Sequence, residues 1–171
     1  MNGHMRRIGL GLTSLLFALP MAAGEIPSTA GISFSEPVLS EANLHSSFGV
    51  REDPLRDRPS WHGGVDLRAE WDAPVFAPAN GEVIYADTKA GYGRMVDLKV
   101  SEGWVIRFAH LSKINVTPGE AIVAGKIVGE VGTTGRYTGP HLHLETLFEG
   151  KQYNPELLKE LSFYVTEIDR D

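Results

Sequence analysis

The stretch GYGRMVDLKVSEGWVIRFAHL, residues 91–111, decides the fold class. It holds two β-rich runs, 95–100 and 104–109, which are joined at Ser101-Glu102-Gly103. Two such runs on either side of a short turn that contains glycine are typical of a β-hairpin. The sequence therefore predicts an antiparallel pair of strands here, with a histidine directly after the second strand.

The flanking segments carry the same kind of pattern. Upstream, APVFAPANGEVIYAD (73–87) places an Asn-Gly pair between apolar stretches, which predicts a second hairpin. Downstream, the glycine corners of 116–135 predict two very short strands, and 142–148 predicts a last strand. The segment 154–161, with asparagine as cap followed by proline, predicts the one short C-terminal helix.

Composition agrees with a mainly β fold built from antiparallel strands. The chain has 171 residues, enough for one domain with a real core, and its apolar share of 42% and charged share of 22% are those of a globular protein. Its 19 glycines and 10 prolines indicate many turns. It has no cysteine, so neither a disulfide framework nor a thiolate metal site is available.

The N-terminus has the plan of a secretory signal peptide. Arg6 and Arg7 precede an uncharged apolar run, and small residues follow, so we expect cleavage after Gly24 and export to the periplasm or cell envelope. The alternative is an uncleaved anchor. Without residues 1–24 the chain has 14 basic against 22 acidic residues, a net charge of −8, which argues against nucleic acid and anionic membrane surfaces as partners.

The rest of the chain is predicted to form one functional domain, which we expect to act as a monomer. Residues 25–45 mix proline, serine and glycine with scattered apolar positions and are predicted to be a leader that joins the domain. The domain itself is predicted to span residues 46–160, and residues 161–171 form a C-terminal tail. The sequence contains no long repeat and no low-complexity segment.

Four of the six histidines carry the chemical signal. His62 begins HGGVD, and its two glycines predict a turn running into a strand, so that the imidazole and Asp66 can converge on one ion. In TGPHLHLE (138–145) a strand would place His141 and His143 on one face. His62, Asp66 and one of these two histidines supply three ligands, the number that a catalytic zinc uses while leaving a position for water.

The structural alternatives are simpler. The His62 and Asp66 side chains could form only a hydrogen bond, and His141 and His143 could each be half-buried strand residues. His110, at the end of the run 104–111, could be a histidine with satisfied hydrogen bonds, unless it manages protons beside a metal. His45 has no ligand set near it and is interpreted as a surface or turn residue.

Taken in order, the segments FGVR, HGGVD, GEV, FAHLS, GEAIVAGKIVGEVGTTG and TGPHLHLE resemble the lysostaphin-type (LytM-type) zinc metallopeptidases, which cut peptide bonds in bacterial peptidoglycan. The resemblance runs from about Ser46 to Pro155. It implies a two-sheet antiparallel β architecture with a duplicated hybrid motif. It also implies one zinc ion, held by His62, Asp66 and His143, with His110 and His141 as the non-ligand active-site histidines.

Two departures from the family pattern concern the substrate site. Some relatives have a tyrosine just upstream of the first ligand, whereas the loop from Glu52 to Trp61 has none, so its role would pass to zinc and a histidine, with Arg51 as a further candidate. Tyr137 stands where small residues are common and is expected to shape a subsite. No metal ligand is missing.

The resemblance predicts a zinc metalloendopeptidase that hydrolyses stem-peptide cross-links, a D,D-endopeptidase if the exported domain acts on directly cross-linked stems. A non-catalytic LytM-type regulator that activates a cell-wall amidase is the alternative from another class, and the complete ligand set argues against it. A carbohydrate- or lipoyl-type β module could account for the glycine ladder but leaves the four histidines and Asp66 unexplained.

Overall fold

The computed structural model describes residues 26–52, 58–135 and 139–165. The predicted signal peptide, Tyr137, the end of the predicted tail and most of the loop between Glu52 and Trp61 lie outside the described residues. Within the described ranges, no helix is long and apolar enough to cross a membrane.

The described residues form twelve strands and one short 3-10 helix, so the prediction of a mainly β fold is confirmed. The elements are β1 (Asn43–Ser46), β2 (Gly49–Glu52), β3 (Pro59–His62), β4 (Val65–Arg68), β5 (Pro74–Phe76), β6 (Gly81–Lys89), β7 (Gly93–Lys99), β8 (Trp104–Ile114), β9 (Ala121–Ile122), β10 (Ile127–Val131), β11 (His141–Phe148), β12 (Lys151–Tyr153) and η1 (Pro155–Leu157).

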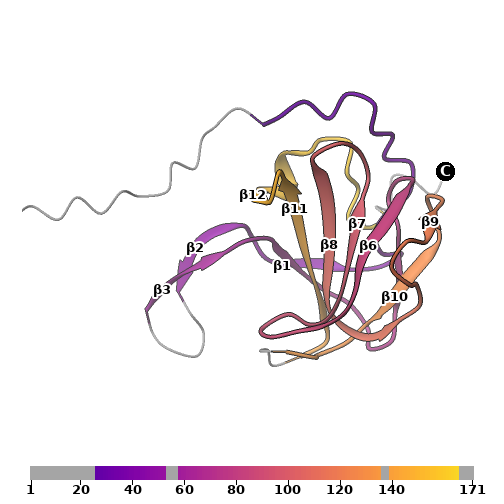
Figure 1. Cartoon of the computed structure of the whole chain (residues 1–171). Helices are drawn as coiled ribbons and strands as arrows, with labels where there is room; N and C mark the ends of the chain where they lie inside the picture. The colour runs from indigo at the N-terminus through magenta and orange to yellow at the C-terminus, as the bar shows by residue number, and fades with distance from the viewer. Residues whose placement is uncertain (1–25, 53–57, 136–138, 166–171) are drawn as a thin grey trace, which may run out of the picture.

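These strands make two sheets, and all pairings between the strands are antiparallel, as predicted. The large sheet has the order β1-β4-β11-β8-β7-β6-β9, with β12 on β11 and with β10 paired to both β5 and β8. The second sheet is the β2–β3 hairpin, which extends to one side of the large sheet (Figure 1). The space between this hairpin and the central strands β11 and β8 is where the functional side chains gather.

The predicted hairpins fare differently. β7 and β8 pair across Ser101-Glu102-Gly103, so that prediction is confirmed. The prediction of an Asn-Gly hairpin is wrong: β5 pairs with β10, while β6 pairs with β7 and β9. A tight Asn-Gly hairpin turn needs positive φ at both residues, and neither Asn80 nor Gly81 has it. Glycine is needed at position 81 because the neighbouring strand lies very close: a Cβ there would overlap the carbonyl oxygen of Lys99.

The C-terminal helix is shorter than predicted. Asn154 caps it as expected, accepting a hydrogen bond from the backbone N–H of Glu156, but only Pro155–Leu157 are helical, in 3-10 form. Leu158 leaves the helical region with ψ of 85°. Leu158 is instead buried in the core. A short α-helix is stable only where its apolar face packs against the rest of the protein, so the sequence of 154–161 alone is not enough to form one.

The core is formed by strands of the large sheet and includes part of the segment predicted as a leader. Trp104 and Phe108 of β8 are among its largest buried side chains. Val38 and Leu39 are fully buried in the same cluster, and their N–H groups donate to the carbonyls of Ser162 and Phe163. Residues from both ends of the described chain therefore pack together, and the functional domain bounds 46–160 stay a prediction.

Candidate metal centre

The HGGVD segment forms a tight corner between two strands. β3 ends at His62 and β4 begins at Val65, which confirms the predicted turn running into a strand. A Cβ at Gly64 would overlap the backbone carbonyl of Leu144 on β11, so the glycine is required by close packing. This corner brings His62 at the end of β3 into contact with Asp66 on β4, and both are buried.

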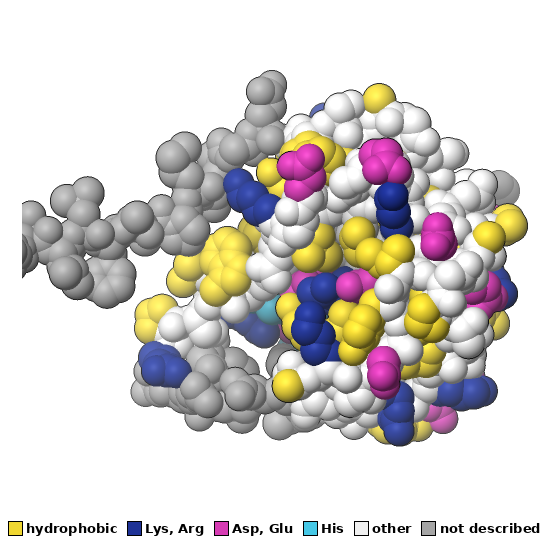
Figure 2. All heavy atoms as spheres, in the orientation of Figure 1, with side chains coloured by type: hydrophobic (Ala, Val, Ile, Leu, Met, Phe, Trp, Pro, Cys, Tyr) yellow, Lys and Arg dark blue, Asp and Glu magenta, His cyan; other side chains and the backbone are white. Residues whose placement is uncertain are grey.

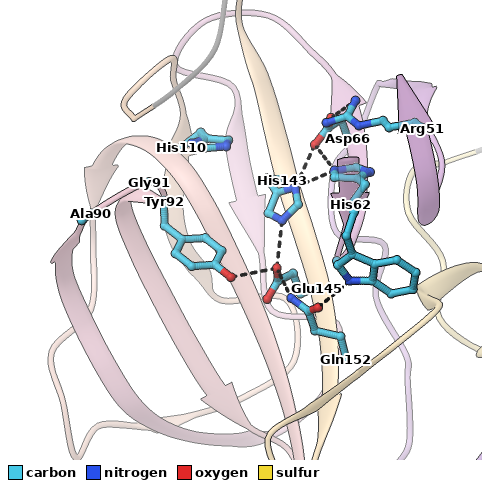
Figure 3. A pocket seen from close by; sticks show the side chains of 12 residues that line it. Arg51, His62, Asp66, Ala90, Gly91, Tyr92, His110, His143, Glu145 and Gln152 are labelled. Carbon is cyan, nitrogen blue, oxygen red and sulfur yellow. Dashed lines mark hydrogen bonds and ion pairs between the residues drawn. The ribbon is translucent and has the colours of Figure 1, made fainter. Parts of the chain in front are cut away.

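The third member of the cluster comes from the neighbouring strand. β11 pairs with β4 so that His143 lies directly opposite Asp66. Asp66 Oδ1 is 3.0 Å from His62 Nε2 and 2.8 Å from His143 Nδ1, and the two nitrogens are 3.1 Å apart. Three atoms that can ligate a metal thus form a small triangle, and the side chains are able to hold a metal ion together (Figure 3).

Hydrogen bonds behind the triangle determine which nitrogens face it. His62 Nδ1 lies 2.8 Å from the carbonyl of Ser47, and because a carbonyl only accepts, this nitrogen carries the proton. His143 Nε2 donates in the same way to Glu145 Oε1 at 3.1 Å. In the neutral tautomers, His62 Nε2 and His143 Nδ1 therefore point their lone pairs inward, as metal-ligating histidines do.

This donor set fits zinc. Two inward lone pairs 3.1 Å apart, next to a carboxylate oxygen, repel one another unless a cation lies between them. Tetrahedral zinc with bonds of about 2.0–2.1 Å places its ligand atoms about 3.3 Å apart, close to the spacing seen. Nitrogen and oxygen ligands without thiolate suit a catalytic zinc, and three protein ligands leave one position for water.

The electrostatics of the cluster also favour positive charge. Burial alone would raise the pKa of Asp66, but without a metal the inward nitrogens of His143 and His62 can also carry protons, and the hydrogen bonds that they then donate hold that pKa well below its usual range. Burial opposes protonation of His143, yet its hydrogen bonds to Asp66 and Glu145 raise its pKa. Arg51 Nη1 lies 3.3 Å from Asp66 Oδ2, so both oxygens of this carboxylate face cationic or donor groups.

His110 lies where the pairing partner of β8 changes. This strand pairs with β11 as far as Ala109 and with β10 from Leu111, and His110 between them has a φ of 62°. A left-handed backbone at a non-glycine residue is costly and is found preferentially at functional sites. The His110 ring centroid lies 5.6 Å from that of His143.

The environment of His110 keeps it neutral. Its Nδ1 donates to the Thr134 carbonyl at 2.6 Å, which leaves Nε2 as an acceptor. Burial, followed by the charges of His143 and His141, lowers the pKa of His110 to about 4. A neutral imidazole with a free lone pair beside a metal centre can accept a proton at neutral pH.

His141 lies on the same face of β11 as His143, as predicted from the period of two. Its ring centroid is 4.9 Å from that of His110, and its Nε2 is 4.0 Å from Asp66 Oδ1. Its Nδ1 donates to the Gly139 carbonyl at 2.9 Å. Burial lowers its pKa as well, so His141 is a second buried, neutral imidazole in contact with the first.

Glu145 is the residue whose importance the histidine spacing did not reveal. Its Oε1 accepts hydrogen bonds from His143, from Tyr92 at 3.1 Å and from Gln152 at 2.8 Å, and its Oε2 accepts one from Arg107 at 3.0 Å. Burial acts against ionisation, but His143 and Arg107 hold its pKa below the usual value. The period of two in TGPHLHLE could have paired Glu145 with His143, whereas its other partners lie on distant segments.

The cluster forms the floor of an open cavity of about 600 Å³. One wall is the β2–β3 hairpin with Arg51 and Trp61, and the other is the turn before β7 with Ala90, Gly91 and Tyr92 (Figure 3). In the space-filling view a histidine is visible in the hollow between the hairpin and the body of the protein (Figure 2). A substrate can therefore reach the floor from solvent.

The remaining sequence predictions find their places around this cavity. His45 is exposed on β1, as expected for a surface residue. Among the described residues that line the cavity, Tyr92 is the one tyrosine. It lies in the wall opposite the hairpin, and its hydroxyl donates to Glu145. The lining residues all belong to 51–152, so the described part of the predicted leader does not line the cavity.

The fold and the cluster define a class: an antiparallel β-sheet protein with a candidate metal centre of two histidines and an aspartate at the floor of an open cavity. The chain belongs to peptidase family M23, whose family model matches residues 60–155. The resemblance to the lysostaphin-type peptidases is thereby confirmed.

Individual relatives are similar over most of the chain. It is 36% identical over 122 residues to the DD-carboxypeptidase/endopeptidase Mpg of Neisseria meningitidis, covering 71% of this chain but only 28% of that protein. Among solved structures, it resembles the catalytic domain of lysostaphin from Staphylococcus simulans (TM-score 0.62, 28% identity, 67% of this chain and 90% of that one). It also resembles a zinc-containing peptidase from Vibrio cholerae (TM-score 0.61, 28% identity, 70% and 36%).

Proposed function

We propose that this chain is an exported, zinc-dependent peptidoglycan endopeptidase that hydrolyses stem-peptide cross-links, most simply as a D,D-endopeptidase. The observation that carries the proposal is the convergence of His62, Asp66 and His143 on one point at the floor of an open cavity, with His110 beside them. Membership of a peptidase family supports the reaction class. The name of the Neisseria relative supports the bond class, although this chain spans about a quarter of that protein.

In this proposal the three ligand atoms are His62 Nε2, Asp66 Oδ1 and His143 Nδ1. When bound, zinc supplies Lewis acidity and lowers the pKa of a bound water to about 7. The protein contributes the tautomers: Ser47 O and Glu145 Oε1 hold the outer N–H groups of the two histidines. Arg51 forms an ion pair with the second carboxylate oxygen of Asp66, Oδ2.

Proton transfer falls to the non-ligand histidines. His110 lines the cavity, and its Nε2 carries a lone pair, so we assign it to accept the proton of the attacking water and to return it to the leaving amine. His141 lies behind it at 2% exposure. Because the Nδ1–H of His141 is donated to Gly139, only Nε2 can act, and it can donate to a developing oxyanion only after taking up a proton.

The test is digestion of purified sacculi with zinc-loaded protein, followed by mass spectrometry of the released muropeptides. We expect loss of cross-linked dimers, and the masses of the products name the bond that is cut. His62→Ala and His143→Ala should lose both zinc and activity, while Val123→Ala, at an exposed side chain outside the cavity lining, is the control. His110→Ala should retain zinc and lose about 10²–10⁴-fold in rate.

The amidase-activating regulator predicts the opposite result. Such a protein would hold no zinc, would release no peptide and would be unaffected by a chelator. Full hydrolysis of sacculi by His62→Ala or His143→Ala would contradict the proposed ligand set.

A further inference from the structure

A line of hydrogen bonds runs from the groove wall to one of the proposed zinc ligands. The indole N–H of Trp61 donates to Gln152 Oε1 at 3.0 Å, and Gln152 Nε2 donates to Glu145 Oε1 at 2.8 Å. The same Glu145 oxygen accepts the Nε2–H of His143 at 3.1 Å. Figure 3 shows Gln152 next to Glu145, which lies between it and His143.

This line crosses between the two sheets. Trp61 belongs to β3 of the two-stranded sheet, and Gln152 belongs to β12, which is paired to β11 of the large sheet. Trp61 is 43% exposed in the cavity wall and packs edge-on against Phe48, with ring centroids 5.0 Å apart. A contact that moves the exposed indole is therefore transmitted to a side chain of the other sheet.

The amide of Gln152 suits its position between Trp61 and Glu145. An indole N–H is a donor and an ionised carboxylate is an acceptor, so the residue between them must present an acceptor on one side and a donor on the other. The same two partners settle which way round the amide lies. The neighbouring corner is shaped to admit it, since a Cβ at Gly63 would overlap the Gln152 amide.

We propose that Gln152 is a positioning residue that couples Trp61 on the substrate groove to His143 through Glu145. The proposal rests on the zinc site of the proposed function and deepens it. Glu145 is fixed on its other oxygen by Arg107. Gln152 fixes the oxygen that receives the His143 proton and so holds the tautomer in which His143 Nδ1 faces the metal. Substrate that packs against Trp61 would thereby act on the geometry of a ligand.

The experiment measures zinc affinity by competition with a chromophoric chelator, without reference to activity. Gln152→Met keeps the length of the side chain and removes both hydrogen bonds, and we expect its zinc Kd to rise about tenfold, the lower end of the range for outer partners of metal ligands. Trp61→Phe keeps the ring on Phe48 and removes only the N–H, and it should raise Kd about threefold. Lys151→Met, on the exposed side of the same strand, is the matched control and should bind as wild type.

The double variant distinguishes coupling from two local effects. If the line acts as a unit, Trp61→Phe/Gln152→Met should match Gln152→Met alone, at about tenfold, whereas independent effects would multiply to about thirtyfold. The melting temperatures of the zinc-free forms show whether a variant is merely less stable. A Kd for Gln152→Met within twofold of wild type, or multiplying effects, would overturn the coupling.

The outcomes separate this coupling from the proposed function. Wild-type protein that binds zinc and shows the coupling but releases no peptide from sacculi would refute the peptidase and leave the coupling standing. Wild-type protein that takes up no zinc would refute both.

Discussion

Replacing Arg107 by methionine should be among the most damaging single changes outside the ligand set. Arg107 forms a two-pronged ion pair with Asp97, Nε to Oδ1 at 2.8 Å and Nη2 to Oδ2 at 2.9 Å. Its Nη1 reaches Glu145 Oε2 at 3.0 Å, and its guanidinium lies 4.9 Å from the Tyr92 ring centre. The side chains of Arg107, Asp97 and Glu145 are only 12%, 10% and 2% exposed.

The magnitude follows from burial. Removing one partner of a buried ion pair leaves an uncompensated charge and costs about 3–5 kcal/mol. Arg107→Met leaves two carboxylates without their cation, so we expect a loss in this range out of a total stability of about 5–15 kcal/mol. Lys113→Met is the matched control: its pair with Glu130 has a 63% exposed lysine and should cost about 0–1 kcal/mol.

The assay is urea unfolding of the zinc-free proteins at pH 7, with free energies compared at unchanged m-value. Adding Asp97→Asn to Arg107→Met removes one of the two orphaned charges and should restore part of the loss. The folded-state pKa of Glu145 lies below its ordinary 4.5, so the stability it contributes is present above that pH and is lost as pH falls through the folded pKa. The deficit of Arg107→Met should accordingly shrink in acid. A loss at pH 7 no larger than that of Lys113→Met would refute the reasoning.

Three further predictions follow from packing and protonation. Gly64→Ala would drive a Cβ into the carbonyl of Leu144 and should cost about 1–3 kcal/mol, measured by thermal unfolding. Trp104→Ala removes a core side chain that is 2% exposed and should cost about 3–5 kcal/mol in urea unfolding, whereas Leu157→Ser, at 54% exposure, should stay within about 0.5 kcal/mol. Because burial lowers the pKa of His110 to about 4, its ring signals in an NMR titration of the zinc-free protein should stay unchanged as pH falls through 6.5 and shift only toward pH 4; a midpoint at or above 6.5 would contradict a neutral His110 at pH 7.

Much of the strand pattern was predictable because its signals are local. The β7–β8 hairpin followed from two β-rich runs around a glycine turn, and β11 followed from its own residues. The Asn80-Gly81 corner misled because turn composition does not tell which strands pair. In the structure β5 pairs with β10, which lies about fifty residues later in the sequence, and not with β6. The predicted length of the C-terminal helix was also wrong because of a tertiary contact: Leu158 is buried in the core and does not continue the helix.

The candidate site divides in a similar way. Two glycines between His62 and Asp66, and a spacing of two between His141 and His143, predicted which side chains share a face. The resemblance added the choice of His143 over His141 as ligand. That choice stays a prediction: in the structure Asp66 Oδ1 is 2.8 Å from His143 Nδ1 and 4.0 Å from His141 Nε2.

The sequence by itself determined the chemical inventory and the local geometry: histidine and carboxylate in place of thiolate, a glycine corner, and two histidines on one strand face. Only the tertiary structure decided that His143 lies opposite Asp66 and that a kink in β8 turns His110 toward them. It also decided that Gln152 and Arg107 support Glu145. The physical reason is that these contacts depend on strand register and sheet closure, which are set by the packing of the whole core and not by neighbouring residues.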